Sequence, residues 1–469
     1  MYDYNDNPEG LNVNDLVLQY EGLLANGNNI FLDSDAFQDL IDYYEEQFEY
    51  TKALQAIEHA LTNYPFSAVF HIRKAQLLLE EDRLDDANSA LSLAKLYEPT
   101  NVDVILTEAE ILHQSQDFDA ALNMLDNALN FADKNDLEDI YMLEASIHES
   151  REDYEESFKS LVKVLKYNPA NEMAYSRLWM CMELTESYEE GIKVSLDIID
   201  RTPYSYWAWY NLGHAYTHMG LYEKALEAYD YTIVINEHFE FAYRDVIACL
   251  FRLENYDLAK RYVEDYKAIF DADAEVLLWE GECYEYSGNH EKARKIYVEA
   301  LKMDQMDGRL HYRIGVSYAT EEKWKPALKA LESAYKQNKD SEEFCIALAE
   351  VYNQLDETEL AYTFYKKAIV IAPEEPITWI SYLEFLIDTE DYEAAAETLE
   401  DARKYSSDIL FDFCEVALLY LNGYRKEANI QLILLLEDGQ DSAKLFELAP
   451  ELEDDNEIRK IVFSFTKNN

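Results

Sequence analysis

Two histidines, His214 and His218, stand four residues apart near the middle of the chain. In a helix this spacing places both rings on one face, as in metal sites that use two histidines. No Glu follows His214 in the metalloprotease pattern, and the sequence shows no third ligand. We therefore expect these rings to form hydrogen bonds on a binding surface, and we predict no metal ligands.

Catalytic motifs are missing from the sequence. It contains no G-x-S-x-G elbow, no glycine-rich phosphate loop and no G-x-G-x-x-G fingerprint. Pairs of carboxylates are common, but 95 acidic residues produce such pairs without any catalytic role. A nucleophilic cysteine needs a nearby histidine, which the sequence does not indicate. We expect no enzymatic activity, no catalytic residues and no cofactor.

The chain is strongly acidic. It has 95 Asp and Glu residues against 40 Lys and Arg, a formal net charge of −55 over 469 residues. Such a charge repels nucleic acids and anionic membranes and attracts basic partners. Two interpretations remain open: the acids coat solvent-facing helices, or they form a dedicated docking surface. In both cases the expected partner is a protein or peptide, with no nucleic acid and no membrane.

Targeting signals are not expected. The first 50 residues contain no Lys or Arg, which signal and transit peptides need near their start. No apolar run approaches the roughly 20 residues of a membrane-spanning helix. The five cysteines are scattered singly, which favours buried free thiols in a reducing compartment. We expect a cytoplasmic protein.

The segment 207–237 carries the clearest motif. It follows the spacing W-x2-L-G-x2-Y and then A-x3-aromatic. These types predict two short helices that pack through a bulky side chain, Trp209, and small residues, Gly213 and Ala225. Neither helix can bury its apolar face alone, so neighbouring pairs must stack. The motif residues are Trp209, Leu212, Gly213, Tyr216, Ala225 and Tyr229.

The same pattern recurs along the chain every 34 residues. The interval is 36 residues between Ala121 and Ser157 and 33 residues at the end. The two extra residues are expected in the loop around Asp133–Asp136. This regularity predicts about 12 helix pairs. The residue that marks each second helix falls at Ala53, Ala87, Ala121, Ser157, Gly191, Ala225, Ala259, Ala293, Ala327, Ala361, Ala395 and Ala428.

Helices are expected to cap both ends of the array. Apolar residues within 11–24 predict an amphipathic helix before the first repeat. The twelfth pair, about 408–437, turns at Gly423, and helices near 442–448 and 454–465 follow. Bare ends would expose an apolar face, which such caps cover. The predicted parts are a tail and capping helix over 1–33, the repeat array over 34–437 and C-terminal capping helices over 438–469.

The span 34–437 resembles tetratricopeptide-repeat proteins, and Trp209 to Ala225 matches their motif best. The resemblance implies an all-α fold, a right-handed superhelical solenoid of helix pairs whose first helices line a concave groove. It also implies an adaptor or scaffold that holds a peptide or partner protein in that groove. The acidic, tyrosine-rich composition is similar to that of tetratricopeptide proteins from Bacteroidetes bacteria. The motif residues are packing residues, so they indicate the fold and not the partner.

In that family the groove-facing positions of each first helix are the second, fifth, sixth, ninth, twelfth and thirteenth, with Trp209 counted as the fourth. In the central repeats these positions carry arginines and aromatics, which are frequent at binding hot spots. Arg177, Arg244 and Arg313 are expected to anchor acidic groups. The opposite interpretation is that the arginines neutralise neighbouring acids and that the aromatics pack against adjacent helices. The predicted groove residues are Arg177, Trp207, Tyr210, Asn211, His214, Phe241, Arg244, Trp279, Arg309, Tyr312 and Arg313.

The first repeats carry acids at the same positions, including Asp39, Asp42, Asp103 and Glu110. That end would prefer a basic segment.

Two alternatives to groove binding remain open. One is a self-assembling structural protein, favoured by any apolar patch on the helix 458–465. The other is an acidic adaptor that sequesters a basic partner. A monomer is favoured, although the sequence does not indicate the oligomeric state.

Overall fold

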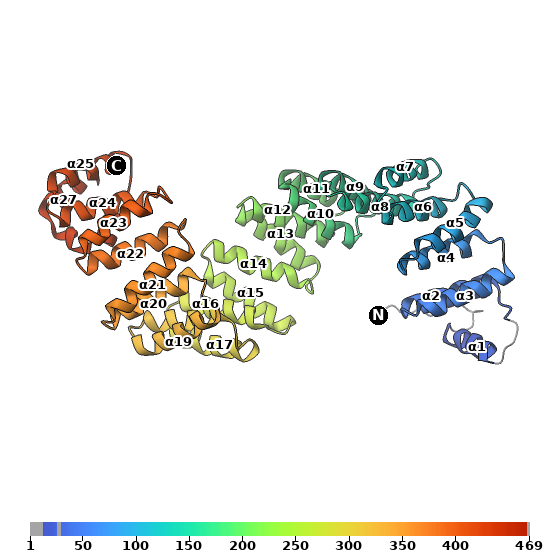
Figure 1. The fold of residues 1–469 in the computed structure, drawn as a ribbon, viewed down its shortest axis with the longest axis horizontal. Helices are drawn as coiled ribbons and strands as arrows, with labels where there is room; N and C mark the ends of the chain where they lie inside the picture. The colour runs from blue at the N-terminus through green and yellow to red at the C-terminus, as the bar shows by residue number, and fades with distance from the viewer. Residues whose placement is uncertain (1–12, 26–29, 467–469) are drawn as a thin grey trace. The chain divides into compact units, whose positions relative to one another are not determined.

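A computed structural model of the chain describes residues 13–25 and 30–466, and all regular structure in this part is helical. The chain divides into two compact units, one up to Cys249 and one from Leu250. Within each unit the helices follow one another as packed pairs (Figure 1). Helices α2 to α25 alternate in sequence as the first and second helices of twelve repeats, which confirms the predicted all-α fold of about 12 pairs.

The first helices of the pairs vary little in length. The exception is α8, which has 15 residues where α6 has 13, so the extra length lies in this helix and not only in the predicted loop around Asp133–Asp136. The first helices are α2 (Ser34–Glu46), α4 (Ala68–Glu80), α6 (Val102–Gln114), α8 (Asp136–Ser150), α10 (Glu172–Thr185), α12 (Tyr206–His218), α14 (Glu240–Arg252), α16 (Ala274–Tyr286), α18 (Gly308–Ala319), α20 (Glu342–Gln354), α22 (Pro376–Asp388) and α24 (Leu410–Leu421).

The second helices begin three residues before the predicted small markers. They are α3 (Tyr50–Asn63), α5 (Leu84–Tyr97), α7 (Phe118–Ala128), α9 (Tyr154–Tyr167), α11 (Tyr188–Arg201), α13 (Tyr222–Ile235), α15 (Tyr256–Ile269), α17 (His290–Met303), α19 (Trp324–Gln337), α21 (Thr358–Ile371), α23 (Tyr392–Ala402) and α25 (Arg425–Glu437).

Every pair turns through one residue with a positive φ, two residues before its second helix. In each turn the next N–H donates to a carbonyl five residues earlier, for example Asp117 N to Leu112 O at 2.9 Å. This is the Schellman closure of a helix end. Asp117 then caps α7, because its carboxylate accepts from the N–H of Ala120. The residues with positive φ in the turns are Phe48, Asp82, Gln116, Glu152, Glu186, Gly220, Glu254, Gly288, Glu322, Asp356, Glu390 and Gly423.

The two helices of a pair meet where a small residue faces a large one. A Cβ placed on Gly213 of α12 would lie 2.6 Å from ring carbons of Tyr229 on α13, a side chain that is only 1% exposed. Tyr297 covers Gly281 in the second unit in the same way. The glycine is therefore required by the close approach of the ring.

Trp209 does not fill that space, although the motif predicts it as the bulky partner of the small residues. Its indole stacks on Tyr231 of α13 with ring centroids 4.3 Å apart. Its N–H donates to the carbonyl of Pro203 at 2.9 Å. Trp209 thus joins the outer edge of the pair to the preceding loop.

The predicted N-terminal capping helix is present as α1 (Val13–Ala25). Its buried side chains Leu16, Val17 and Tyr20 share a core with α2 and α3. The Tyr20 hydroxyl lies 2.8 Å from Nδ1 of His59 on α3. Residues 11–12 of the predicted helix, and the tail before it, lie outside the described residues.

The predicted C-terminal helices are α26 (Ala443–Leu448) and α27 (Asn456–Thr466), joined by a 3₁₀ helix, η1 (Pro450–Asp454). Ile458 is fully buried, and Ile461 and Val462 pack against the same core, so most of the apolar face of α27 is covered. Phe463 is 59% exposed. The three-part division at residues 33 and 437 stays a prediction.

Two other predictions concern cysteines and membranes. All five cysteines are free and buried, as predicted. No described helix has the length and apolar character to cross a membrane.

Replacing Gly213 by alanine is expected to lower the free energy of unfolding by about 1–3 kcal/mol, because the buried ring of Tyr229 must move. Urea unfolding followed by circular dichroism measures the change. The matched control is Gly22→Ala in α1, where an added Cβ meets no atom within 4 Å and helix propensity should increase stability by about 1 kcal/mol. Equal effects of the two variants would contradict the packing described here.

Replacing Gln116 by glycine is expected to raise the free energy of unfolding by up to about 1 kcal/mol. Gln116 is exposed and has φ 61°, a conformation that costs a side chain about 1–2 kcal/mol, partly offset by the greater freedom of glycine in the unfolded chain. The reverse change, Gly220→Ala at φ 71° in open space, should destabilise by about 1 kcal/mol. Thermal unfolding compares the two, and changes of the same sign would refute this view of the turns.

Candidate functional site

The predicted groove residues fall on first helices of both units. Those on α10, α12 and α14 belong to the first unit, and those on α16 and α18 belong to the second. In the first unit Trp207 and Tyr210 are in direct contact, with ring centroids 6.0 Å apart. Phe241 reaches them through Phe239, which the sequence analysis did not single out. The first unit therefore holds the larger connected group.

Five aromatic rings from α10, α12 and the start of α14 form this group, which we call the aromatic cluster. Trp207 lies parallel to Tyr175 at 6.2 Å and meets Phe239 edge-on at 4.9 Å. Phe239 also contacts Tyr210 at 4.9 Å and Phe241 at 5.7 Å. Tyr175 and Phe239 do not occupy the groove positions of the family, which is why they were missed. Phe241 is 60% exposed, so the cluster reaches the surface.

Several polar atoms beside these rings lack a partner. Nε1 of Trp207, Oδ1 of Asn211 and Oδ2 of Asp245 are buried and accept or donate no hydrogen bond. The Asn211 amide donates to the carbonyl of Tyr175 at 3.3 Å, which makes it a buried bridge between α10 and α12. The Tyr210 hydroxyl is hydrogen-bonded to Asp245, and burial raises the pKa of this carboxyl to about 6. A buried donor without a partner is costly, and a ligand can satisfy it.

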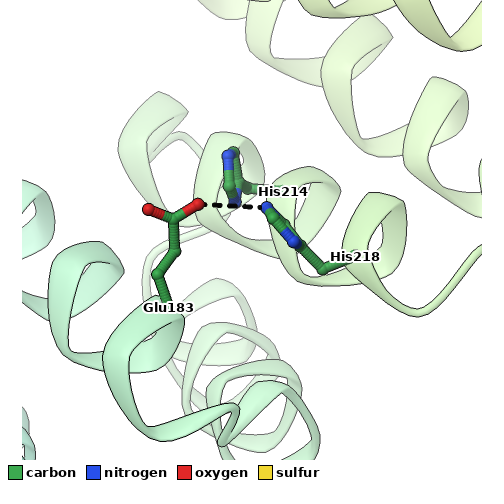
Figure 2. A group of neighbouring side chains, drawn as sticks. All are labelled: Glu183, His214 and His218. Atoms are coloured by element: carbon green, nitrogen blue, oxygen red, sulfur yellow. Dashed lines mark ion pairs between the residues drawn. The ribbon is translucent and has the colours of Figure 1, made fainter. Parts of the chain in front are cut away.

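The two histidines have a neighbour that the sequence did not reveal. Glu183, at the twelfth position of α10, lies 3.2 Å from Nε2 of His218. The indole N–H of Trp179 points at His214, with ring centroids 5.1 Å apart. The predicted hydrogen bonding of these rings is thus present, and Figure 2 shows the carboxylate facing both rings.

The arginines of the first unit are held by acids and hydroxyls of the chain itself. Nε of Arg177 donates to Glu149 at 2.9 Å, and its Nη2 donates to Ser146 at 3.0 Å. Arg244 pairs with Glu240 one turn earlier at 2.9 Å. A partner would have to replace these acids, so the anchoring role of the arginines stays a prediction.

The arginines of the second unit are paired in the same manner. Arg313 forms an ion pair with Glu282, which is 8% exposed. Arg309 is bidentate to Asp307, with Nη2 2.9 Å and Nε 3.2 Å from its carboxylate oxygens. The carboxyl of Asp307 has a pKa below its usual value because these hydrogen bonds outweigh burial.

The predicted aromatics of the second unit are less connected than those of the first. Tyr312 stacks on Phe344 of α20 at 5.1 Å, and burial raises its pKa to about 12. Trp279 is half-buried on α16.

The acidic positions of the early repeats differ in their pairing. Asp42 is neutralised by Arg73, whose Nη2 lies 2.5 Å away. Burial and the charges of Glu80 and Asp139 raise the pKa of Glu110 to about 7. Within the described chain no Lys or Arg forms an ion pair with Glu110. The charge of Glu110 is therefore not compensated by an ion pair, unlike that of Asp42.

Sequence comparisons agree with the geometry. Models of the tetratricopeptide repeat match residues 138–171, 206–239, 280–342 and 342–375. These matches and the twelve helix pairs define a helical-repeat protein. The chain contains tetratricopeptide repeats over these residues.

No curated protein sequence matches the chain. Solved structures with a similar fold share little sequence with it. The APC/C hetero-tetramer Cut9–Hcn1 is 13% identical, with a TM-score of 0.43 over 87% of this chain and 95% of the other. YrrB, a tetratricopeptide protein with an unusual peptide-binding site, is 17% identical, with a TM-score of 0.32 over 39% and 95%. A tetratricopeptide-repeat protein from Parabacteroides merdae is 16% identical, with a TM-score of 0.41 over 57% and 99%.

Replacing Glu110 by glutamine is expected to stabilise the protein above pH 7 and to have little effect near pH 4.5. The folded state holds the Glu110 proton up to about pH 7, whereas the unfolded chain releases it near pH 4.5, so ionised Glu110 costs stability as the pH rises between these values. A gain of about 1–2 kcal/mol at pH 8 allows for partial solvent screening.

Urea unfolding at pH 4.5 and pH 8 measures this difference. The control is Glu108→Gln on the same helix, where Glu108 pairs with Lys95 at 2.6 Å at the surface. That variant should lose no more than about 0.5 kcal/mol at pH 8. A pH-independent effect of Glu110→Gln would show that its neighbours do not shift its ionisation.

Proposed function

We propose that this protein is a non-enzymatic scaffold that binds an extended or helical peptide segment on the first-helix face of α6 to α14. The tetratricopeptide-repeat family supports a protein-interaction scaffold in general. The peptide site rests on one observation, the aromatic cluster with its unpartnered Trp207 N–H.

The aromatic cluster suits an apolar anchor residue of the partner. Phe241 is 60% exposed and contacts Phe239, which is buried, and Met173 on α10 is 63% exposed. Exposed rings on a buried aromatic base provide rigid contact area with little loss of side-chain freedom. The Trp207 N–H is placed to donate to a peptide carbonyl, which would satisfy a buried donor.

A second subsite lies on the first helices that precede the cluster, and both include residues of α10. A pocket of about 360 Å³ is lined by acids of α6 and α8 and by two residues of α10. Asp103, Glu110 and Asp139 supply its negative charge, and Met173 and Arg177 border it. A basic side chain of the partner would relieve the mutual repulsion of these acids. The preferred partner segment therefore combines an apolar residue with a nearby Lys or Arg.

The two alternative functions have different support. A basic partner held by charge alone is favoured by the same acidic pocket, and its affinity would fall steeply with salt. Self-assembly through α27 has weaker support, because most of the apolar face of this helix is packed against the core and only Phe463 is well exposed.

Replacing both Phe241 and Met173 by serine is expected to weaken peptide binding at least about tenfold, which corresponds to about 1.4 kcal/mol. Peptides are first selected on the full chain from a displayed random library, and affinity is then measured by fluorescence anisotropy at low and high salt. The matched control is Val234→Ser, an 81% exposed apolar side chain on the second helix α13. It should bind as the unchanged protein does.

Three results would count against the proposal. Selection that enriches no peptide would remove peptide binding as the function. Selected peptides that bind the double serine variant with unchanged affinity would move the site away from the aromatic cluster. Binding that disappears at high salt and is lost in Glu110→Gln with Asp139→Asn, but not in the serine variant, would favour the acidic adaptor.

A further inference from the structure

Glu183, His214 and His218 converge on one small region between two neighbouring first helices. Glu183 is at the C-terminal end of α10, and the histidines are one turn apart near the end of α12. One ligand atom from each residue lies within 4.8 Å of the other two. Within the described chain this is the only group of three such side chains so close together.

The geometry goes beyond a simple ion pair. Oε1 of Glu183 lies 3.2 Å from Nε2 of His218, which a hydrogen bond alone would explain. The ring of His214 is not needed for that bond, yet it lies 4.6 Å from the ring of His218 between centroids. Figure 2 shows a nitrogen of each ring and the carboxylate directed into the same space. Ligands of a tetrahedral ion with bonds of 2.0–2.1 Å are separated by roughly 3.3 Å, so small side-chain movements complete the triangle.

Neighbouring side chains hold the rings in place. The indole nitrogen of Trp179 is almost equidistant from the two ring nitrogens of His214, at 2.7 and 2.8 Å, and the ring planes cross at 87°. The Trp179 N–H therefore donates to the His214 ring. Tyr188 stacks on His218 at 4.8 Å with an interplanar angle of 7°.

We propose that Glu183, His214 and His218 bind a divalent first-row transition metal ion, with Zn²⁺ as the preferred class. Two imidazoles and one carboxylate match the ligand preference of zinc and disfavour Mg²⁺ and Ca²⁺, which need oxygen ligands.

The site has an open side. The side chains of His218 and Glu183 are 34% and 37% exposed, so solvent or a donor atom from another molecule can supply a fourth ligand. The ion would join α10 to α12 by coordinate bonds across the boundary between two repeats. This inference stands apart from the peptide site, since none of its three ligands belongs to the aromatic cluster.

Isothermal titration of Zn²⁺ into the chelator-treated full-length chain, in excess Mg²⁺, tests the site. One ion per chain is expected to bind. His218→Ala and Glu183→Gln should each weaken binding by at least about tenfold, because even indirect metal neighbours contribute 10–100-fold. Both residues are partly exposed, so the variants should keep the circular dichroism spectrum of the unchanged protein.

The controls are His238→Ala and Glu189→Gln, which change an exposed His and an exposed Glu of the same unit. They should bind Zn²⁺ as the unchanged protein does. Co²⁺ bound at the site should show the intense visible absorption of a four-coordinate ion, and His218→Ala should lose it. Binding abolished by Mg²⁺ would indicate diffuse association with carboxylates and overturn the proposal. Stoichiometric Zn²⁺ binding that survives in His218→Ala would overturn it as well.

Discussion

The turn inside each helix pair is the constraint on which the rest of the structure depends. One residue takes a left-handed conformation, the following N–H closes on a carbonyl five residues earlier, and the second helix starts one residue later. All twelve turns do this, with glycine at only three, Gly220, Gly288 and Gly423. Because backbone groups make the closure, the turn has the same geometry whether its left-handed residue is Phe48, Gln116 or a glutamate. Each first helix therefore presents the same positions to its neighbour and the same positions to solvent.

This constraint explains which features could be predicted from the sequence. The marker Ala225 is fully buried. A small residue recurs at this position every 34 residues because it packs inside each pair, and it therefore predicts where each second helix lies. The turn residues could not be predicted in this way, because the sequence does not distinguish a glutamate in the left-handed conformation, such as Glu254, from an exposed glutamate in a helix. A repeat motif also does not predict contacts between repeats. Phe239 lies in a loop outside the motif positions, and Glu183 precedes His218 by a whole repeat. Their proximity follows from how neighbouring pairs stack, which the period alone does not specify.

The acidic composition determines what the arginines do. With 95 acids in the chain, a guanidinium on a first helix meets a carboxylate of the same or the preceding first helix before it meets a partner. Arg177 with Glu149 and Arg313 with Glu282 are both of this kind. Arg, Trp and Tyr are all enriched at binding hot spots, but these arginines are already paired with acids of the chain. The acidic composition therefore favours the aromatic rings, and not the arginines, as the candidate source of binding energy.

Helix α12 shows how one repeat separates packing from recognition. Ala208, Leu212 and Ala215 are spaced by four and three residues, and all are buried against neighbouring helices. Trp207, Tyr210, His214 and His218 are spaced by three, four and four residues and share a different face. The first series must stay small and apolar for the pairs to stack, so it can carry no information about a ligand. The second series can carry larger rings, which contact Tyr175, Trp179 and Phe239 of the neighbouring elements.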